Sequence, residues 1–230
     1  MRGPSGLRSA LEALKMWKKV GLVAFLAAAL VGCSGSGPIG HRFTNPEKLS
    51  KRWDNPSRDE WQKPNEVITA MDIQEGMTVV DLGAGTGYFV PHLARAVGAT
   101  GKVLALDVEE PMVAHLSARF EGAALTNASA KLVPYEDPQL QPGSVDRILV
   151  VNTWHHIRNR GQYAAKLAAG LKKGGAVVIV DYAKDYDGPG PPMHIRLSLE
   201  KVSEELAAGG LKAEVLTETL PKQYIIVGRK

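Results

Sequence analysis

The sequence predicts an α/β fold in which a mostly parallel sheet is covered by helices on both faces. Apolar runs of strand length alternate with helical patterns along the chain. Residues 79–89, Val-Val-Asp-Leu-Gly-Ala-Gly-Thr-Gly-Tyr-Phe, are typical of a buried strand that enters a glycine turn and then a helix. The last two expected strands, 213–219 and 223–228, are joined by a very short link, so they should pair antiparallel.

Proline marks where several of the expected helices begin and end. Two short helices, at 57–63 and 65–71, are separated at Pro64, because proline cannot sit inside a helix. Pro111 opens a later helix, in the first turn, where a missing amide costs nothing. The other expected elements are strands at 78–82, 102–108, 130–133, 146–152 and 176–181, helices at 88–97 and 161–172, and a helix capped by Ser198 that ends near Ala208.

The glycine turn predicts a site for a nucleotide-like ligand. Gly83, Gly85 and Gly87 follow one another at every second position, where a side chain would block the approach of a ligand to the backbone. A helix from about Tyr88 would direct its free amides and its positive end at that ligand. Asp81 places a carboxylate at the end of the strand, which suits a ligand with an ammonium group and would repel a pyrophosphate.

The spacing of the glycines disfavours a dinucleotide and hence a nicotinamide-dependent oxidoreductase. The dinucleotide fingerprint G-x-G-x-x-G would require glycine at position 88, which is Tyr88. About twenty residues after the turn, Asp107 ends a second buried strand, at the position that lies over ribose hydroxyls in folds of this kind.

With these motifs the sequence resembles the class I S-adenosylmethionine-dependent methyltransferases over residues 48–230. The resemblance rests on the turn 81–87, on Asp107, on 143–152 (Gly-Ser-Val-Asp-Arg-Ile-Leu-Val-Val-Asn) and on 171–175 (Leu-Lys-Lys-Gly-Gly). Residues 55–64 and 152–157 are similar to a bacterial subgroup that often carries a lipoprotein leader. The resemblance implies a doubly wound, Rossmann-like sheet of seven strands in the order 3-2-1-4-5-7-6, with the last strand antiparallel. It also implies S-adenosyl-L-methionine as cofactor and methyl transfer to a small-molecule acceptor.

The resemblance assigns cofactor contacts to particular positions. It implies that Asp107 binds the ribose and that Arg58 pairs with the carboxylate of the cofactor. Relatives carry an acid for adenine after the third strand, but the matching position is Pro134, so Glu136 or Asp137 replaces it, or apolar contacts and main chain hold the base. The full implied set is Arg58, Asp81, Gly83, Ala84, Gly85, Thr86, Gly87, Tyr88, Asp107, Val108, Glu136 and Asn152.

Two histidines at the end of the fourth strand are the expected catalytic residues. His155 and His156 follow Asn152 at the edge where ligands bind in open α/β sheets. One of them, by preference His155, is expected to act as a base or to orient the acceptor, and the other to pack or cap. No third ligand lies at a recognisable spacing, so no metal is expected. Tyr182 and His194 flank a Gly- and Pro-rich loop at 184–194 that is long enough to be a lid.

Residues 1–32 resemble a lipoprotein-type signal peptide, and 33–47 a flexible tether before the methyltransferase domain at 48–230. Lys18 and Lys19 precede a short apolar run, and Leu30-Val31-Gly32-Cys33 is similar to a lipobox. Cys33, the only cysteine, is therefore expected to be lipidated, the alternative being a buried cysteine in a short anchor. The resulting expectation is a membrane-anchored lipoprotein at the periplasmic face of a Gram-negative envelope.

The net charge gives no support for a nucleic-acid partner. The whole chain carries +4, and residues 1–32 hold five basic residues and one acidic residue, so the remainder is close to neutral. The leading hypothesis is thus a methyltransferase that acts on a small molecule. The alternatives are a non-catalytic module of the same fold that binds S-adenosylmethionine or a nucleoside and, less favoured, a nicotinamide-dependent oxidoreductase.

Overall fold

The computed structural model describes residues 43–216 and 220–230. The predicted leader, Cys33 and residues 33–42 of the predicted tether lie outside the described residues, as does the end of the strand expected at 213–219. Within the described part of the chain, no helix is both long enough and apolar enough to cross a membrane.

Seven strands form one sheet in the order β3-β2-β1-β4-β5-β7-β6, which confirms the predicted fold class. β1 to β5 run parallel to one another, while β7 runs antiparallel to both of its neighbours, β5 and β6. The strands are β1 (Thr78–Leu82), β2 (Lys102–Asp107), β3 (Ala128–Leu132), β4 (Val145–Val151), β5 (Leu171–Tyr182), β6 (Lys212–Leu216) and β7 (Gln223–Arg229).

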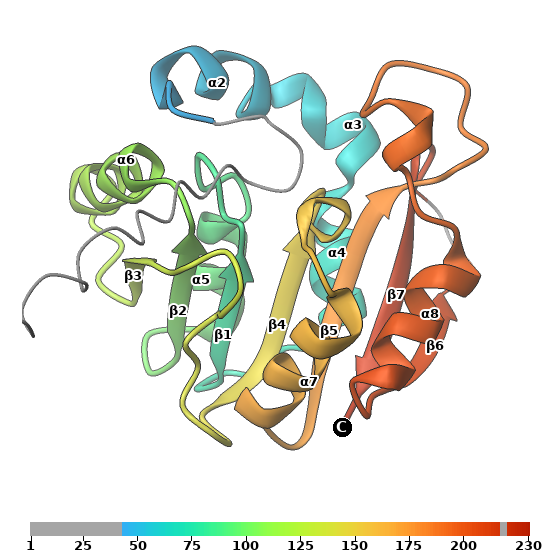
Figure 1. The fold of residues 1–230 in the computed structure, drawn as a ribbon. Helices are drawn as coiled ribbons and strands as arrows, with labels where there is room; N and C mark the ends of the chain where they lie inside the picture. The colour runs from blue at the N-terminus through green and yellow to red at the C-terminus, as the bar shows by residue number, and fades with distance from the viewer. Residues whose placement is uncertain (1–42, 217–219) are drawn as a thin grey trace, which may run out of the picture. The chain divides into compact units, whose positions relative to one another are not determined.

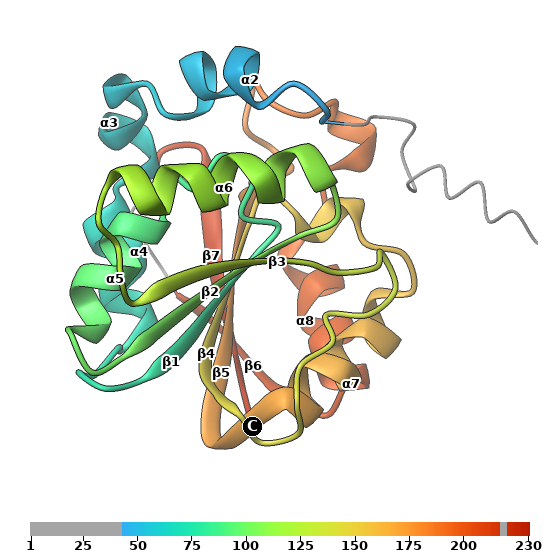
Figure 2. The same cartoon turned by 90° about the vertical axis from the view of Figure 1, so that its left-hand side faces the viewer.

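Helices cover both faces of this sheet (Figures 1 and 2). On one face lie α4 (Pro64–Met71), α5 (Val90–Val97) and α6 (Glu110–Gly122), and on the other lie α7 (Arg160–Gly170) and α8 (Leu199–Ala208). Successive strand residues point to opposite faces. Val79 therefore packs in the apolar cluster under α4 and α5, and Val80 in the cluster under α7 and α8.

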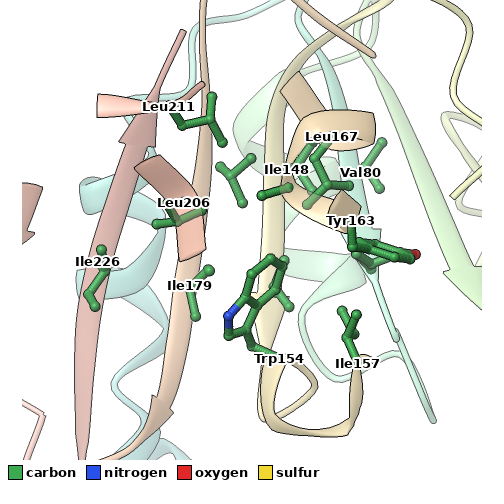
Figure 3. Close-up of a cluster of buried hydrophobic side chains, with 14 of the residues drawn as sticks. Val80, Ile148, Trp154, Ile157, Tyr163, Leu167, Ile179, Leu206, Leu211 and Ile226 are labelled. Carbon is green, nitrogen blue, oxygen red and sulfur yellow. The ribbon is translucent and has the colours of Figure 1, made fainter. Parts of the chain in front are cut away.

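The cluster under α7 and α8 contains Trp154, which is fully buried between the two helices and the sheet (Figure 3). Its indole Nε1 donates to a carboxylate oxygen of Glu205 at 3.0 Å, and Arg160 binds the same oxygen at 2.8 Å. A buried indole N–H needs an acceptor, and Glu205 supplies it. Trp154 thus anchors the segment that follows β4, and with it the two histidines that come next.

The structure adds a helix that the sequence pattern did not reveal. α2 (Pro46–Trp53) has no buried residue, so it lacks the apolar stripe that marks most helices. Its capping signals are present nevertheless, because Asn45 accepts a hydrogen bond from the Lys48 amide at 2.9 Å and Pro46 occupies the first turn. The helix after the glycine turn begins at Val90 instead of Tyr88, and β5 begins at Leu171, which pairs with Val145.

The short helices that remain lie mainly at the carboxyl ends of the parallel strands. Figure 1 shows α2 and α3 (Asp59–Gln62) above this edge, together with the loop between β5 and α8. Three 3-10 turns complete the described elements: Pro56–Arg58, Trp154–His156 and Met193–Ile195. Every residue that the sequence singled out for binding or catalysis and that the structure describes belongs to this edge or to the loops beside it.

Candidate functional site

The glycine turn owes its composition to backbone conformation and to packing within the protein. Gly83 and Gly87 have φ angles of +73° and +85°, which residues other than glycine rarely adopt. A Cβ atom on Gly83 would lie 2.5 Å from the side chain of Thr153, and one on Gly87 would lie 2.7 Å from Leu116. At Gly85 the nearest neighbour of an added Cβ would be the ring of Trp53, at 3.2 Å. The side chain of Trp53 in α2 therefore lies directly over the turn.

Asp107 supports the glycine turn from the end of β2. Its carboxylate accepts hydrogen bonds from the amide of Gly85 at 2.8 Å and from the amide of Glu109 at 3.0 Å. Burial raises the pKa of Asp107, and the backbone donors Glu109, Gly85 and Val108 oppose that rise. Each carboxylate oxygen can accept a second bond, so the group retains capacity for two ligand hydroxyls.

Asp81 is a buried carboxylate at the end of β1 that faces Arg58. Burial raises its pKa to about 7, the positive charge of Arg58 lowers it, and the neighbouring Asp107 raises it further. Among the described residues, no hydrogen-bond donor binds the Asp81 side chain. A buried acid of this kind favours a bound cation, which would restore the ionised form.

Arg58 lies over the ring of Tyr88, with its guanidinium carbon 3.9 Å from the ring centroid. Desolvation lowers the pKa of Arg58, while nearby Tyr88, Asp54 and Asp81 raise it. Its Nε and Nη2 both donate to the side-chain oxygen of Gln62, at 3.3 and 3.0 Å, and Nη1 donates to the Trp53 carbonyl at 2.8 Å. A guanidinium has five N–H groups, so one N–H on each terminal nitrogen remains for a ligand.

His155 forms a buried pair with Asp181, a residue that the sequence analysis did not single out. Nδ1 of His155 lies 2.9 and 2.8 Å from the two carboxylate oxygens of Asp181. Those oxygens also accept from the amides of Tyr182 and His155 itself, so the carboxylate acts only as an acceptor. In the neutral form of the imidazole, this geometry matches the tautomer that donates from Nδ1 and leaves the lone pair on Nε2. Only the position of Asp181 at the end of a buried strand could have signalled its role.

His156 lies against His155 and against the ring of Phe43. The rings of His155 and His156 are 4.1 Å apart at their centroids. Phe43 makes edge contacts with His156 at 5.7 Å and with Trp53 at 5.3 Å. These rings link the end of β4 to the segment over the glycine turn.

Asp54 fastens the end of α2 to the rest of the domain. One carboxylate oxygen accepts from the Thr86 hydroxyl at 2.8 Å, and the other pairs with Arg119 of α6 at 2.8 Å. Arg119 also donates to the Thr86 carbonyl at 2.6 Å. The contacts of Asp54 with Thr86 and Arg119, called the Asp54 latch below, thus hold the neighbouring Trp53 in place. Asp59, in α3, likewise accepts from the Tyr88 hydroxyl.

On the side of the site where adenine is expected, Tyr135 donates to Glu109 at 2.7 Å and joins the loops that follow β2 and β3. The side chain of Glu136 is exposed and its carbonyl accepts from Lys166, which also pairs with Asp137. The two other predicted contacts, Ala84 and Val108, are partly buried against the apolar core.

The loop at 184–194 is organised around the buried Arg196. This side chain donates to carbonyls of the loop, including Pro191 at 2.8 Å and Gly188 at 3.2 Å. Tyr182 lies between Trp61 and Arg196, and His194 is exposed. In the described part of the chain, no three His, Cys, Asp or Glu side chains come together as a metal site.

Comparison with known proteins shows that the chain is similar to methyltransferases. Residues 79–175 match the methyltransferase domain family. The ubiquinone/menaquinone biosynthesis C-methyltransferase of Klebsiella pneumoniae is 24% identical over 70% of this chain and 67% of its own. The demethylmenaquinone methyltransferase of Staphylococcus aureus is 31% identical over 53% of this chain and 48% of its own. Across its curated relatives, the chain spans about a third to two thirds of their length.

A solved structure covers more of the chain. An S-adenosylmethionine-dependent methyltransferase from Aquifex aeolicus superposes with a TM-score of 0.75 and 29% identity, over 80% of this chain and 98% of that one. The strand order, the glycine turn and the acid that ends β2 agree with these matches. The chain therefore has the class I methyltransferase fold, and its residues 79–175 are similar to the methyltransferase domain family.

Proposed function

We propose that this domain binds S-adenosyl-L-methionine at the carboxyl edge of the sheet and transfers its methyl group to a small-molecule acceptor. The observation that supports this most directly is the proximity of two groups of opposite charge, Asp81 and Arg58, to the carboxylate of Asp107 with its two acceptor oxygens. An amino-acid group carries an ammonium and a carboxylate, and a ribose carries two hydroxyls. The three side chains match these groups in charge and hydrogen bonding.

The residues present suit the cofactor at each end. The two remaining N–H groups of Arg58 suit a carboxylate, and the buried Asp81 suits the ammonium. Asp107 can accept from ribose hydroxyls while it holds the turn. Tyr135 and Glu109 join the loops on the adenine side, and Glu136 or Asp137 remains a predicted partner of the base. When bound, the cofactor supplies an activated methyl group, so the protein needs mainly to align the acceptor.

The His155–Asp181 pair favours an enzyme over a non-catalytic binding module. Nε2 of His155 is oriented as a base, because Asp181 holds the proton on Nδ1. In the proposed reaction the acceptor atom gains the methyl group and loses its own proton to Nε2. The ionised Asp181 then stabilises the imidazolium that results. A module that only stores a ligand has no need for such a pair.

The acceptor that we propose is a small molecule with an apolar part. Phe43, Trp53 and Trp61 bring aromatic rings to this edge of the sheet, and basic groups lie beside them, including Lys222, which lies 4.7 Å from the Trp61 ring centroid. Relatives named as a ubiquinone/menaquinone biosynthesis C-methyltransferase and as a demethylmenaquinone methyltransferase agree with an acceptor of this kind. We also propose that a lipid on Cys33 anchors the domain at the periplasmic face of the membrane, as the lipobox-like segment predicts.

Calorimetry on the full chain tests the cofactor assignment. S-adenosylmethionine and S-adenosylhomocysteine should bind at micromolar levels, and NAD far more weakly. Binding of NAD at comparable strength, or no binding of S-adenosylhomocysteine, would refute the proposal. Product formation from a metabolite panel, followed by mass spectrometry, then separates an enzyme from a binding module.

A further inference from the structure

A chain of hydrogen bonds between side chains runs from Arg58 to Asn152 through two buried glutamines. Arg58 donates to the side-chain oxygen of Gln62, and Nε2 of Gln62 donates to the side-chain oxygen of Gln223 at 2.6 Å. Nε2 of Gln223 then donates to the side-chain oxygen of Asn152 at 2.6 Å. Arg58 ends a 3-10 turn, Gln62 ends α3, Gln223 begins β7 and Asn152 directly follows β4, and Gln62 and Gln223 are 161 positions apart.

Arg58 fixes the donor-to-acceptor direction of these hydrogen bonds. A guanidinium has no acceptor, so Gln62 must turn its oxygen toward Arg58 and its amide nitrogen toward Gln223. The same constraint passes to Gln223 and to Asn152, because each amide that accepts on one side donates on the other. Gln62 is fully buried and Gln223 is 4% exposed, so water does not compensate for a reversed amide. A reversal would leave N–H facing N–H, with both donors unpaired in a buried position, which is unfavourable.

Asn152, directly after β4, is the last residue in this series of hydrogen bonds. Its φ angle of +52° belongs to the left-handed region, which asparagine tolerates better than most residues. Its side-chain oxygen is used by Gln223, and among the described residues its Nδ2 group has no hydrogen-bond partner. Asn152 is only partly buried, and it precedes by three positions the histidine that we propose as the base. Its free donors therefore lie at the edge where the acceptor must bind.

We propose that Gln62 and Gln223 are positioning residues that make Asn152 a donor toward the methyl acceptor, which must carry an oxygen at that point. An enolate, phenolate or hydroxyl oxygen has a lone pair to accept from Nδ2. A neutral amine attacks through its single lone pair and presents only N–H groups to its surroundings, which Nδ2 cannot bind. Amines are thus disfavoured as acceptors, and oxygen-bearing small molecules are favoured. This inference rests on the proposed function, because it assigns the acceptor of the same site.

The hydrogen-bonded series Arg58–Gln62–Gln223–Asn152, called the relay below, can be tested without knowledge of the acceptor. The measurement is hydrogen exchange of the side-chain amides in the full-length protein, held in detergent with S-adenosylhomocysteine. In the wild type, the Nε2 protons of Gln62 and Gln223 should be protected, and the Nδ2 protons of Asn152 should exchange rapidly. Gln223→Glu, studied above pH 8, places an obligate acceptor in the relay. Asn152 should then reverse its amide, and its Nδ2 protons should become about tenfold more protected. The matched control is Gln162→Glu, which lies on the exposed face of α7.

Two small aromatic probes test the acceptor class. We expect 1-naphthol to shift the Asn152 amide signal in the wild type and 1-naphthylamine to shift it about tenfold more weakly at the same concentration. Gln223→Glu should reverse this preference. Gln223→Met, which ends the relay without adding a charge, should abolish it and serves as the second variant if the first fails to fold.

The outcomes separate this inference from the proposed function. The inference is overturned if the protection of the Asn152 Nδ2 protons is the same in Gln223→Glu as in the wild type. It is also overturned if the wild type prefers 1-naphthylamine or shows no preference between the two probes. Either result counts even if S-adenosylhomocysteine binds. Failure of S-adenosylhomocysteine to bind, with the protection pattern as expected, would instead overturn the proposed function and leave the relay in place.

Discussion

The carboxylate of Asp107 accepts a hydrogen bond from the amide of Gly85 at 2.8 Å, so the acid that ends β2 also holds the glycine turn that follows β1. One side chain thereby sets the shape of the turn and presents two acceptors beside it. The neighbouring strands β1 and β2 are in register from Thr78 with Lys102 to Leu82 with Leu106, which brings the two loops together. Loss of Asp107 should accordingly affect both binding and the local fold.

We expect Asp107→Ala to weaken S-adenosylhomocysteine binding by roughly 1.5–3 kcal/mol, because two charge-assisted hydrogen bonds disappear. Calorimetry measures the affinity, and thermal unfolding measures the accompanying loss of stability in the turn. Glu121→Ala, on the exposed surface of α6, is the control and should change neither. Equal affinities for the wild type and Asp107→Ala would show that Asp107 does not bind the ligand.

Cofactor affinity should depend on pH through Asp81. The pKa of Asp81 is about 7 without ligand, and a bound ammonium favours its ionised form. Affinity for S-adenosylhomocysteine should therefore fall by about tenfold per pH unit below pH 7 and level off above it. Calorimetry in buffers of different ionisation enthalpy should detect proton release on binding. Asp81→Asn should bind weakly at every pH, with a flat profile, and a slope that persists in this variant would point to another group.

The same group should make the ligand-free protein less stable as the pH rises. Unfolded Asp81 ionises near its ordinary pKa of 3.8, whereas the folded protein keeps the proton up to about 7. Between these values the folded state binds more protons, so the free energy of unfolding contributed by this group decreases with pH. Asp81→Asn should thus be more stable than the wild type at pH 8 and similar to it at pH 4, as measured by urea unfolding. A stability gain of equal size at both pH values would contradict the assignment.

Replacement of His155 by alanine should lower turnover by roughly 10²–10⁴-fold, because the reaction loses its base. Asp181→Asn should also lower turnover, because its amide would donate to Nδ1 and move the proton to Nε2. The affinity for S-adenosylhomocysteine should stay within about twofold of the wild type. His115→Ala on α6 provides the control. Wild-type turnover in both variants would mean that alignment alone suffices for methyl transfer.

The latch at Asp54 should control how firmly α2 covers the glycine turn. Asp54→Asn removes the ion pair with Arg119 and leaves a weaker bond to Thr86. Backbone amides of α2 should exchange about tenfold faster, and S-adenosylhomocysteine should dissociate faster. Hydrogen exchange by mass spectrometry follows the first effect and stopped-flow the second. Asp72→Asn alters a more exposed pair with Arg147 and should leave α2 unchanged.

Expression in a Gram-negative host tests the anchor. Radioactive palmitate should label the wild type and leave Cys33→Ser unlabelled, while both proteins bind S-adenosylhomocysteine equally. Labelling that persists in Cys33→Ser would rule out the lipobox interpretation.

The fold class and the glycine turn followed from the sequence alone, because local patterns encode them. Continuous apolar runs of strand length predict strands buried on both faces, and Gly83 and Gly87 need backbone angles that other residues avoid. The end of a strand places Asp107 at the sheet edge regardless of what else packs there. The resemblance then supplied the strand order and the cofactor.

Only the tertiary structure decided which side chains act together. Asp181 and Gln223 lie on β5 and β7, far along the chain from the residues that they bind. Their partners are set by strand register and sheet order, which no local pattern reports. Trp53 and Asp54 reach the glycine turn from a polar helix whose position depends on contacts with α6, because α2 buries no apolar stripe of its own. The tertiary structure also decides how the side-chain amides of Gln62, Gln223 and Asn152 are oriented. The guanidinium of Arg58 can only donate, and this fixes an orientation that the sequence leaves open.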